Sequence, residues 1–446
     1  MLRSRLLPAL LLSSAIVAGT IGVPAASAGG VASGDARAAS AALKAAASAP
    51  AEYRAGEVVV RDATGERVVR VRDVAQAAQS LSSRPGVRSA TPNFLARASG
   101  WIPPDPGRGA EIGGWQKLQW NFLPETGVNA PEAWANLARA GRPGGKGVVV
   151  AVLDTGVAYA NRGRFRRSPD FSKARFVRGW DFVEDDAYPN DDNGHGTHVA
   201  STIAEGTGNT IGLTGLAYGV KIMPVKVLDS QGEGDSQQIA DGIRFAAKNG
   251  AQVINLSFEF PSEITKSQIP NILDAIRYAR KRGTLVVGAS GNAAAAAVAY
   301  PARSSDVLSV GATTQYGCQA DYSNEGSDLD LVAPGGGIDA ALEGDPNCQA
   351  ARTGMDIFQM TFRASSPRRF LLPSGYIGTS MAAPHVAATA ALVIASGILG
   401  PKPSPAAIER RLELTSTDVG PAGRDPHYGW GRLNAARATD PTIPVI

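Results

Sequence analysis

The fold can be predicted from residues 148–156, which read Val148-Val149-Val150-Ala151-Val152-Leu153-Asp154-Thr155-Gly156. Six consecutive apolar residues without polar alternation are typical of a strand that is buried on both faces of a sheet. Further runs of this kind follow at 222–227, 253–256, 285–287 and 307–310. Helical patterns at 236–249 and 269–282 separate several of them. We therefore predict an α/β fold, a three-layer sandwich with a mainly parallel central sheet.

A carboxylate stands at the end of the first of these strands. Asp154 follows the apolar run directly, and Thr155 and Gly156 turn the chain after it. Open α/β sheets place their ligand sites at the carboxyl ends of their strands. Asp154 is therefore a candidate functional residue, although an aspartate there could also simply cap a turn.

The chain has only four histidines, so a histidine-based mechanism has few candidates. His195 lies in Asp192-Asn193-Gly194-His195-Gly196-Thr197-His198, where the chain breaks and an apolar helix begins. A histidine at a helix start is held rigidly and keeps one edge of its ring free. His195 and His198 could instead be structural or share a metal ion, but two histidines without further ligands make a poor zinc site.

Ser380 is the candidate nucleophile. It lies in Gly378-Thr379-Ser380-Met381-Ala382-Ala383-Pro384-His385, at the amino end of an Ala-rich run that reads as a buried helix. Serine needs an adjacent base to attack at neutral pH, and a histidine oriented by a carboxylate can supply it. No Gly-x-Ser-x-Gly surrounds Ser380, which disfavours a lipase or esterase. The alternative is a serine that only caps its helix.

An asparagine completes this set. Asn292 follows Ser290 and Gly291 just beyond the apolar run 285–287. Its side-chain amide could donate to the negative charge that develops when a serine attacks a carbonyl carbon. Alone, Asn292 could be a turn residue. All four residues in one chain, next to buried elements, are hard to attribute to chance.

Composition excludes other classes of protein. The 446 residues carry a net charge of only +4, which argues against dedicated nucleic-acid binding. A hydrophobic content of 44% fits a globular protein. Cys318 and Cys348 are the only cysteines, and in an oxidising compartment they are expected to form a disulfide, with two buried thiols as the alternative.

The first part of the chain predicts export. Arg3 and Arg5 precede a mostly apolar stretch, Leu6–Val23, and Ala26-Ser27-Ala28 fits a signal-peptidase site. We predict a signal peptide at 1–28, secretion, and no stable membrane anchor after cleavage, the alternative being a retained membrane helix.

Three segments follow the predicted signal peptide. Residues 29–50 are interpreted as a linker or weak helix, and 51–97 as a small α+β unit that is marginal alone and packs on the rest of the chain. Residues 101–114 read as an exposed linker because they are rich in Pro and Gly.

The motifs resemble those of the subtilase family of serine proteases. The similar stretches cover roughly 115–437; they are 152–157, 193–200, 290–292, 331–335, 378–387 and 428–435. The order Asp154, His195, Ser380 is that of subtilisin. The resemblance implies that these three form a catalytic triad, that Asn292 completes an oxyanion hole, and that the chain is a serine endopeptidase acting on proteins and peptides through an acyl-enzyme.

The resemblance also implies a maturation pathway and a metal. Residues 29–100, with a core at about 51–97, resemble a subtilase propeptide that acts as chaperone and intramolecular inhibitor before the enzyme removes it, leaving 101–446 as the catalytic domain. The loop 207–215 resembles the family's calcium loop. The implied calcium ligands are side chains of three residues and backbone carbonyls of three others: Gln119, Asp170 and Asn209, then Thr207, Ile211 and Leu213.

Some positions depart from the family pattern. Serine stands at 201 where the family usually has glycine, and 338–375 reads as an inserted surface loop without an assignable role. Phe258, Glu259 and Phe260 replace smaller residues at the substrate-binding edge. The residues expected to line this cleft are Gly232, Glu233, Gly234, Ser257, Phe258, Glu259, Ser290 and Gly291. Glu233 and Glu259 suggest the hypothesis of a preference for basic substrate residues, the alternative being that both side chains simply face solvent.

Two other functions are the alternatives to a serine endopeptidase: a catalytically silent binding protein and a Ser-His-Asp esterase.

Overall fold

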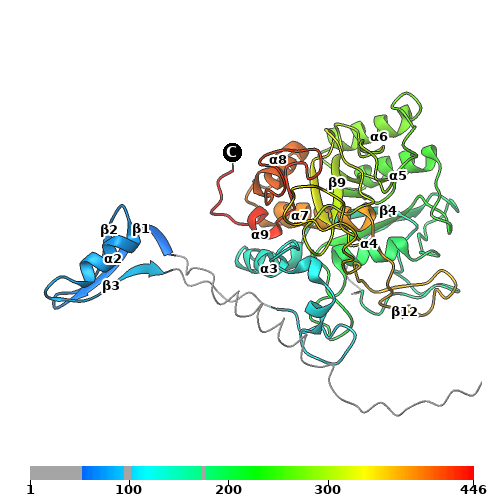
Figure 1. Cartoon of the computed structure of the whole chain (residues 1–446). Coiled ribbons are helices and arrows are strands. Elements are labelled where there is room, and N and C mark those ends of the chain that lie inside the picture. The colour runs from blue at the N-terminus through cyan, green and yellow to red at the C-terminus, as the bar shows by residue number, and fades with distance from the viewer. Residues whose placement is uncertain (1–52, 95–101, 172–175, 446) are drawn as a thin grey trace, which may run out of the picture. The chain divides into compact units, whose positions relative to one another are not determined.

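The computed structural model describes residues 53–94, 102–171 and 176–445. The chain divides into two compact units, Met1–Arg97 and Ala98–Ile446, drawn in Figure 1. The predicted signal peptide at 1–28 and the predicted linker at 29–50 lie outside the described residues.

The first unit is a small antiparallel sheet covered by one helix. Its elements are β1 (Tyr53–Asp62), β2 (Gly65–Arg70), α2 (Val74–Ser82) and β3 (Val87–Phe94), with strand order β2-β1-β3. Val58 and Val60 of β1 are buried against Val74 and Ala78 of α2. Asp73 caps the helix by accepting a hydrogen bond from the backbone N of Gln76. These elements match the α+β pattern expected for 51–97, and a core this small gives little stability of its own.

The second unit contains a seven-stranded parallel sheet, as predicted. Its strand order is β10-β9-β8-β7-β4-β6-β5. The strands are β4 (Val149–Asp154), β5 (Trp180–Asp181), β6 (Lys221–Lys226), β7 (Val253–Leu256), β8 (Leu285–Ala289), β9 (Leu308–Thr313) and β10 (Leu331–Pro334). Because β4 lies between β6 and β7, its carboxyl end is central in the sheet, with Asp154 opposite Lys226.

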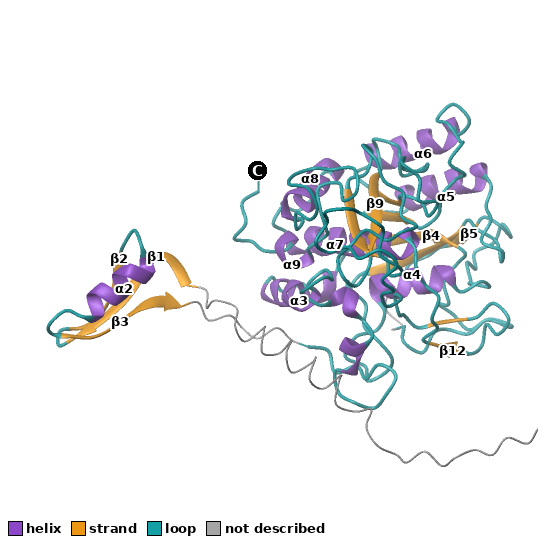
Figure 2. Cartoon of the chain, in the orientation of Figure 1, coloured by secondary structure: helices purple, strands orange, loops and turns teal. Residues whose placement is uncertain are grey.

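Helices cover both faces of this sheet, which makes the three layers visible in Figure 2. The α-helices are α3 (Ala130–Arg139), α4 (His195–Ala204), α5 (Ser236–Lys248), α6 (Pro270–Lys281), α7 (Thr379–Ser396), α8 (Pro405–Thr415) and α9 (Ala435–Ala438). Short 3-10 turns occupy η1 (Gly114–Lys117), η2 (Trp120–Phe122) and η3 (Pro143–Gly145). The period of two along β4 separates the faces: Val150 and Val152 pack with α4 and α7, whereas Ala151 and Leu153 pack with α5 and α6.

Helix α7 is apolar on all sides because it is the core helix of the unit. Its length and composition would suffice to cross a membrane, but 78% of this apolar stretch is buried inside the protein. It packs on α4 and on strands β7 to β10. The helix therefore forms part of the hydrophobic core, and its amino end is brought to the carboxyl ends of the strands.

The prediction of an exposed linker at 101–114 is wrong for the described part of that segment. Asp105 is fully buried, and its carboxylate accepts hydrogen bonds from the backbone N–H groups of Gly208 and Asn209. Gly107 N donates to Gly212 O, and Trp115 Nε1 donates to Pro103 O. Proline and glycine here shape an ordered segment that holds the loop 207–213, and composition alone does not distinguish this from a free linker.

The segment 338–375 is also more than a surface loop. It contains the two-stranded ribbon of β11 (Thr361–Phe362) and β12 (Phe370–Leu371), and Ile357 and Phe362 are buried. Ser201 Oγ of α4 donates to Met360 O over 3.1 Å. The serine that departs from the family glycine therefore anchors this segment to the helix that begins at His195.

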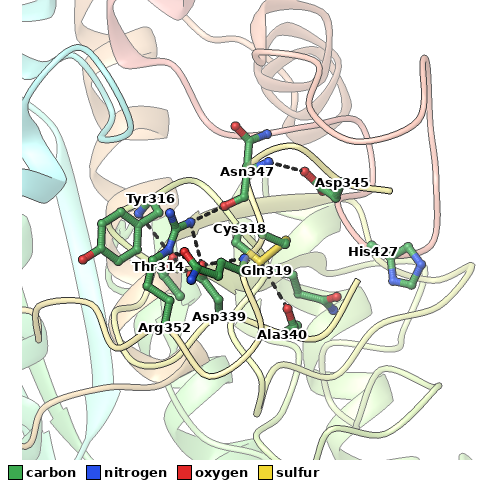
Figure 3. The surroundings of a disulfide bond; sticks show 12 residues. Thr314, Tyr316, Cys318, Gln319, Asp339, Ala340, Asp345, Asn347, Arg352 and His427 are labelled. Carbon is green, nitrogen blue, oxygen red and sulfur yellow. Dashed lines mark hydrogen bonds and ion pairs between the residues drawn. A yellow bond between two sulfur atoms is a disulfide. The ribbon is translucent and has the colours of Figure 1, made fainter. Parts of the chain in front are cut away.

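A disulfide joins the amino-terminal part of this segment to the loop after β9, as expected from the two cysteines. Cys318 and Cys348 are bonded, with their Cα atoms 4.8 Å apart. Figure 3 shows the polar cluster beside the bridge: buried Asp339 accepts hydrogen bonds from Thr314 Oγ1 and Arg352 Nε. The bridge and the Asp339 cluster fix one end of the segment, while Ser201 holds its interior at Met360.

Candidate active site

Asp154 and His195 form a direct hydrogen bond. Asp154 is the last residue of β4 and fully buried, and its Oδ1 lies 2.8 Å from His195 Nδ1. Close approach is possible because residue 196 is glycine: a Cβ there would lie only 3.0 Å from Asp154 Cβ and would clash with Gly156 O. This contact fixes Nδ1 as the protonated nitrogen of a neutral ring and leaves Nε2 free to accept a proton.

The carboxylate also sets the charge state of the imidazole. Burial lowers the pKa of His195, but the charge of Asp154 and its hydrogen bond raise it more, and Asp191 adds to the rise. The net pKa lies above the ordinary histidine value. Asp154 therefore stabilises the protonated imidazole, which is the form that a general base creates when it takes a proton.

Asp191 is a supporting residue that the sequence did not single out. Its buried carboxylate accepts hydrogen bonds from Gly194 N, from Thr197 N and Oγ1, and from Thr155 Oγ1. It thereby ties the start of α4 to the turn after β4. Asp191 lies three residues before Gly194, the N-cap of α4, so no local capping pattern singled it out in the sequence.

Ser380 lies at the amino end of α7, beside the end of β7. Its Oγ donates to Ser257 O over 3.1 Å, and Ser257 Oγ donates back to Ser380 O over 2.8 Å. Among the described residues no hydrogen bond joins Ser380 Oγ to His195. The serine is partly exposed and its hydroxyl can be redirected by rotation about χ1. The structure thus brings the Asp154–His195 pair together directly, and holds Ser380 on Ser257.

Asn292 is held by the residue before the serine. Its Oδ1 accepts hydrogen bonds from Thr379 N over 2.8 Å and Thr379 Oγ1 over 3.0 Å. Because the oxygen is occupied in this way, the amide nitrogen is the end of the side chain that can donate. Asn292 is exposed, so this donor is accessible to a ligand.

The residues expected at the rim of the cleft divide into two groups. Ser257, Phe258 and Glu259 follow β7, and Ser290 and Gly291 follow the neighbouring strand β8. Gly232, Glu233 and Gly234 lie in a separate loop, which Asn193 Nδ2 holds near His195 by donating to Ser230 O over 3.0 Å. Ser230 also lines a hollow of about 760 Å³, and residues 364–369 of the inserted segment line the same hollow.

Two other histidines, His198 and His385, have structural contacts. His198 Nε2 donates to Ile357 O over 2.9 Å, its ring stacks on Tyr376, and burial lowers its pKa to about 3. Burial lowers the pKa of His385 to about 4, and this ring accepts from Asn121 Nδ2 and donates to Met381 O. With Nε2 of His198 taken up by a carbonyl, the geometry does not favour the alternative of a metal shared with His195.

The residues predicted to bind calcium lie close together around the loop 207–213. Asn209 Nδ2 donates to Asp170 Oδ1 over 2.7 Å, and Leu213 N donates to Asp170 Oδ2 over 3.1 Å. Gln119 Oε1 accepts from Thr214 N, just beyond the loop. Thr207 and Ile211 belong to the same loop.

The donor set of this loop fits calcium in its chemistry. It offers carboxylate, amide and carbonyl oxygens, which are the ligands that Ca²⁺ prefers. Asn209 Oδ1 accepts a hydrogen bond from Ile211 N in this structure. A half-turn of this amide would exchange its Oδ1 and Nδ2 and so place the oxygen on the side of Asp170. In the described part of the chain no cluster of three His, Cys, Asp or Glu side chains forms a metal site. Calcium would therefore depend on amide and carbonyl oxygens beside one carboxylate.

The fold and this constellation define a hydrolase built on a parallel α/β sheet. Residues 145–431 match the model of the Subtilase family. The chain belongs to the subtilase family and is a serine endopeptidase.

Relatives of known function agree over most of the chain. It is 32% identical over 371 residues to the thermophilic serine proteinase of Bacillus sp. (strain AK1), covering 83% of this chain and 77% of that one. It is 37% identical to Subtilisin Savinase of Lederbergia lenta, covering 66% and 91%, and 33% identical to thermitase of Thermoactinomyces vulgaris, covering 76% and 99%. Among solved structures, a protease from Pseudoalteromonas arctica PAMC 21717 superposes with a TM-score of 0.61 at 31% identity, covering 76% of this chain and 99% of that one.

Proposed function

We propose that this protein is a secreted serine endopeptidase in which Asp154, His195 and Ser380 form the catalytic triad and Asn292 contributes to the oxyanion hole. The observation that carries the proposal is the 2.8 Å contact between Asp154 Oδ1 and His195 Nδ1 at the carboxyl end of the central strand. The amino end of α7, with Ser380, is held to the neighbouring strand by Ser257.

The proposed mechanism assigns one role to each group. Ser380 Oγ turns from Ser257 O to His195 Nε2, gives up its proton and attacks the peptide carbonyl carbon. Asp154 stabilises the imidazolium that results, and Asn292 Nδ2 donates to the oxyanion. The imidazolium then protonates the leaving amine. In the second half of the reaction His195 takes a proton from the water that attacks the acyl-enzyme, and it gives this proton to Ser380 Oγ as the acid product leaves.

Hydrolysis of denatured casein and of a small ester tests this proposal. An endopeptidase cleaves both substrates, an esterase cleaves only the ester, and a silent binding protein cleaves neither. The variant to compare with the wild type on both substrates is Ser380→Ala, since it removes only the proposed nucleophilic oxygen.

We further propose that the chain is made as a zymogen, and predict that the secreted wild type begins between about residues 96 and 116. Mass spectrometry of the amino terminus measures this. Ser380→Ala should keep the unit around 53–94 attached, because the proposed cut is made by the enzyme itself. Identical mature termini in wild type and Ser380→Ala would contradict self-processing and point to another protease.

The calcium proposal predicts a change in stability. Excess EGTA should lower the melting temperature of the enzyme inhibited by a sulfonyl fluoride by roughly 5 °C or more, because a ligand that binds only the folded state stabilises it. Calorimetry with and without added calcium measures the difference. Asp170→Asn is the control: its melting temperature should be lower and nearly independent of EGTA. Equal melting curves of the wild type in both conditions would exclude a stabilising calcium.

A further inference from the structure

Glu259 has an unusual position beside the proposed oxyanion donor. A methyl group built on Gly291 would lie 2.6 Å from Glu259 Oε2, so the carboxylate lies directly against the backbone that precedes Asn292. Burial raises the pKa of Glu259, while hydrogen bonds from the Asn292 backbone N–H and side-chain amide lower it. A carboxylate that follows β7 thus reaches across to the segment that follows β8.

The flanking residues explain why Glu259 points this way. Phe258 and Phe260 are partly buried against the core, and Phe260 N donates to Tyr300 O. In an extended segment alternate side chains face opposite sides, so two aromatic residues anchored in the core direct the residue between them outward. Glu259 is accordingly exposed, and a ligand can reach it.

No cationic side chain in the described part of the chain pairs with this carboxylate. Within the residues that the structure describes, Glu259 has no Lys, Arg or His partner within 4.0 Å, although the protein forms such pairs at many other carboxylates. A cationic ligand at this carboxylate would favour its charged form, because opposite charges attract at close range.

The two segments that Glu259 spans are also those that define where a substrate must lie. Ser257 contacts the proposed nucleophile, and Asn292 carries the proposed oxyanion donor. A peptide carbonyl bound between Ser380 Oγ and Asn292 Nδ2 belongs to the residue on the amino side of the cut. The side chain of that residue is attached to the Cα atom next to this carbonyl carbon. It must therefore enter the space between these two segments, where the carboxylate of Glu259 lies.

We propose that Glu259 is a specificity residue that receives the cationic side chain of an arginine or lysine immediately before the cleaved bond. The proposal rests on the proposed active site and refines the sequence-based hypothesis, since it assigns the preference to Glu259 and not to Glu233. Asn292 Nδ2 cannot donate fully to Glu259 and to an oxyanion at once. A substrate cation that engages Glu259 therefore also releases the amide for catalysis, so the preference should appear in kcat as well as in KM.

Two matched peptide p-nitroanilides test this inference, one ending in arginine and the other in citrulline, its uncharged isostere. The wild type should cleave the arginine substrate with a kcat/KM roughly 10- to 100-fold higher, because the cation both pairs with Glu259 and releases the Asn292 amide; this ratio corresponds to about 1.4–2.7 kcal/mol of transition-state stabilisation. Glu259→Gln should remove this ratio, because glutamine carries no charge that could pair with the arginine side chain. Glu263→Gln is the matched control, because Glu263 is an exposed carboxylate four residues further along the same segment.

The outcomes separate this inference from the proposed function. Equal cleavage of the two peptides by a wild type that digests casein would overturn the role of Glu259 and leave the endopeptidase intact. Failure to cleave casein would overturn the proposed function. If Glu259→Gln slows both peptides equally, the residue acts on the structure of the site and not on substrate choice. Sequencing of casein fragments adds an independent readout, since most new carboxyl termini should be arginine or lysine.

Discussion

Ser380→Ala is expected to lower kcat/KM for peptide hydrolysis by about 10⁴- to 10⁶-fold. Alanine removes the atom proposed to attack the carbonyl carbon, and the proposed mechanism assigns this role to no other hydroxyl. The hydrogen bond from Ser380 Oγ to Ser257 O is lost as well, but Ser257 Oγ still donates to the backbone carbonyl of residue 380, so the amino end of α7 should stay in place.

A matched change distinguishes lost chemistry from lost structure. Thr389→Ser, in the buried middle of α7, keeps the hydroxyl that donates to His385 O and should leave activity nearly unchanged. The melting temperature of Ser380→Ala should lie within a few degrees of the wild type. An alanine variant that keeps more than about a tenth of the activity would refute Ser380 as the nucleophile.

Asp154→Asn should give the second large effect, a fall in kcat of about 10⁴-fold near neutral pH. The amide can donate to Nδ1 and so favour the tautomer that protonates Nε2, which then cannot act as a base. It also lacks the charge that stabilises the imidazolium. Among the carboxylates near His195, Asp154 is the one in direct contact, so Asp191→Asn should reduce activity less.

The pH profile provides a second readout for Asp154. A general base must be neutral, so kcat/KM falls as the pH drops through the pKa of His195. Because Asp154 holds this pKa above the ordinary value of about 6.5, the acid limb of the wild type should have its midpoint above that value. The residual activity of Asp154→Asn should show an acid limb at lower pH. A limb that does not move would mean that another group controls the base.

The central strands and the three-layer sandwich are predictable because the sequences of buried parallel strands are continuous apolar runs. The run 148–153 became β4, and the helical pattern at 236–249 became α5, each within about two residues. The candidate residues were also visible, since Asp154 follows a strand and His195 and Ser380 begin helices. The prediction for 101–114 is wrong because Pro- and Gly-rich composition describes the local chain and not its contacts. The prediction for 338–375 misses its ribbon and buried residues because a departure from the family pattern does not show what a segment contacts.

Local pattern thus accounts for the elements, their order and the chemical groups at their ends. Folding decided which of these groups meet: Asp154 with His195, Ser380 with Ser257, and Glu259 with Asn292. The physical reason is that periods of two and of 3.6 residues record which side of an element is buried. They carry no information about which loops and helix ends become neighbours once the strands align, and the carboxyl edge of this sheet is built from such loops and helix ends.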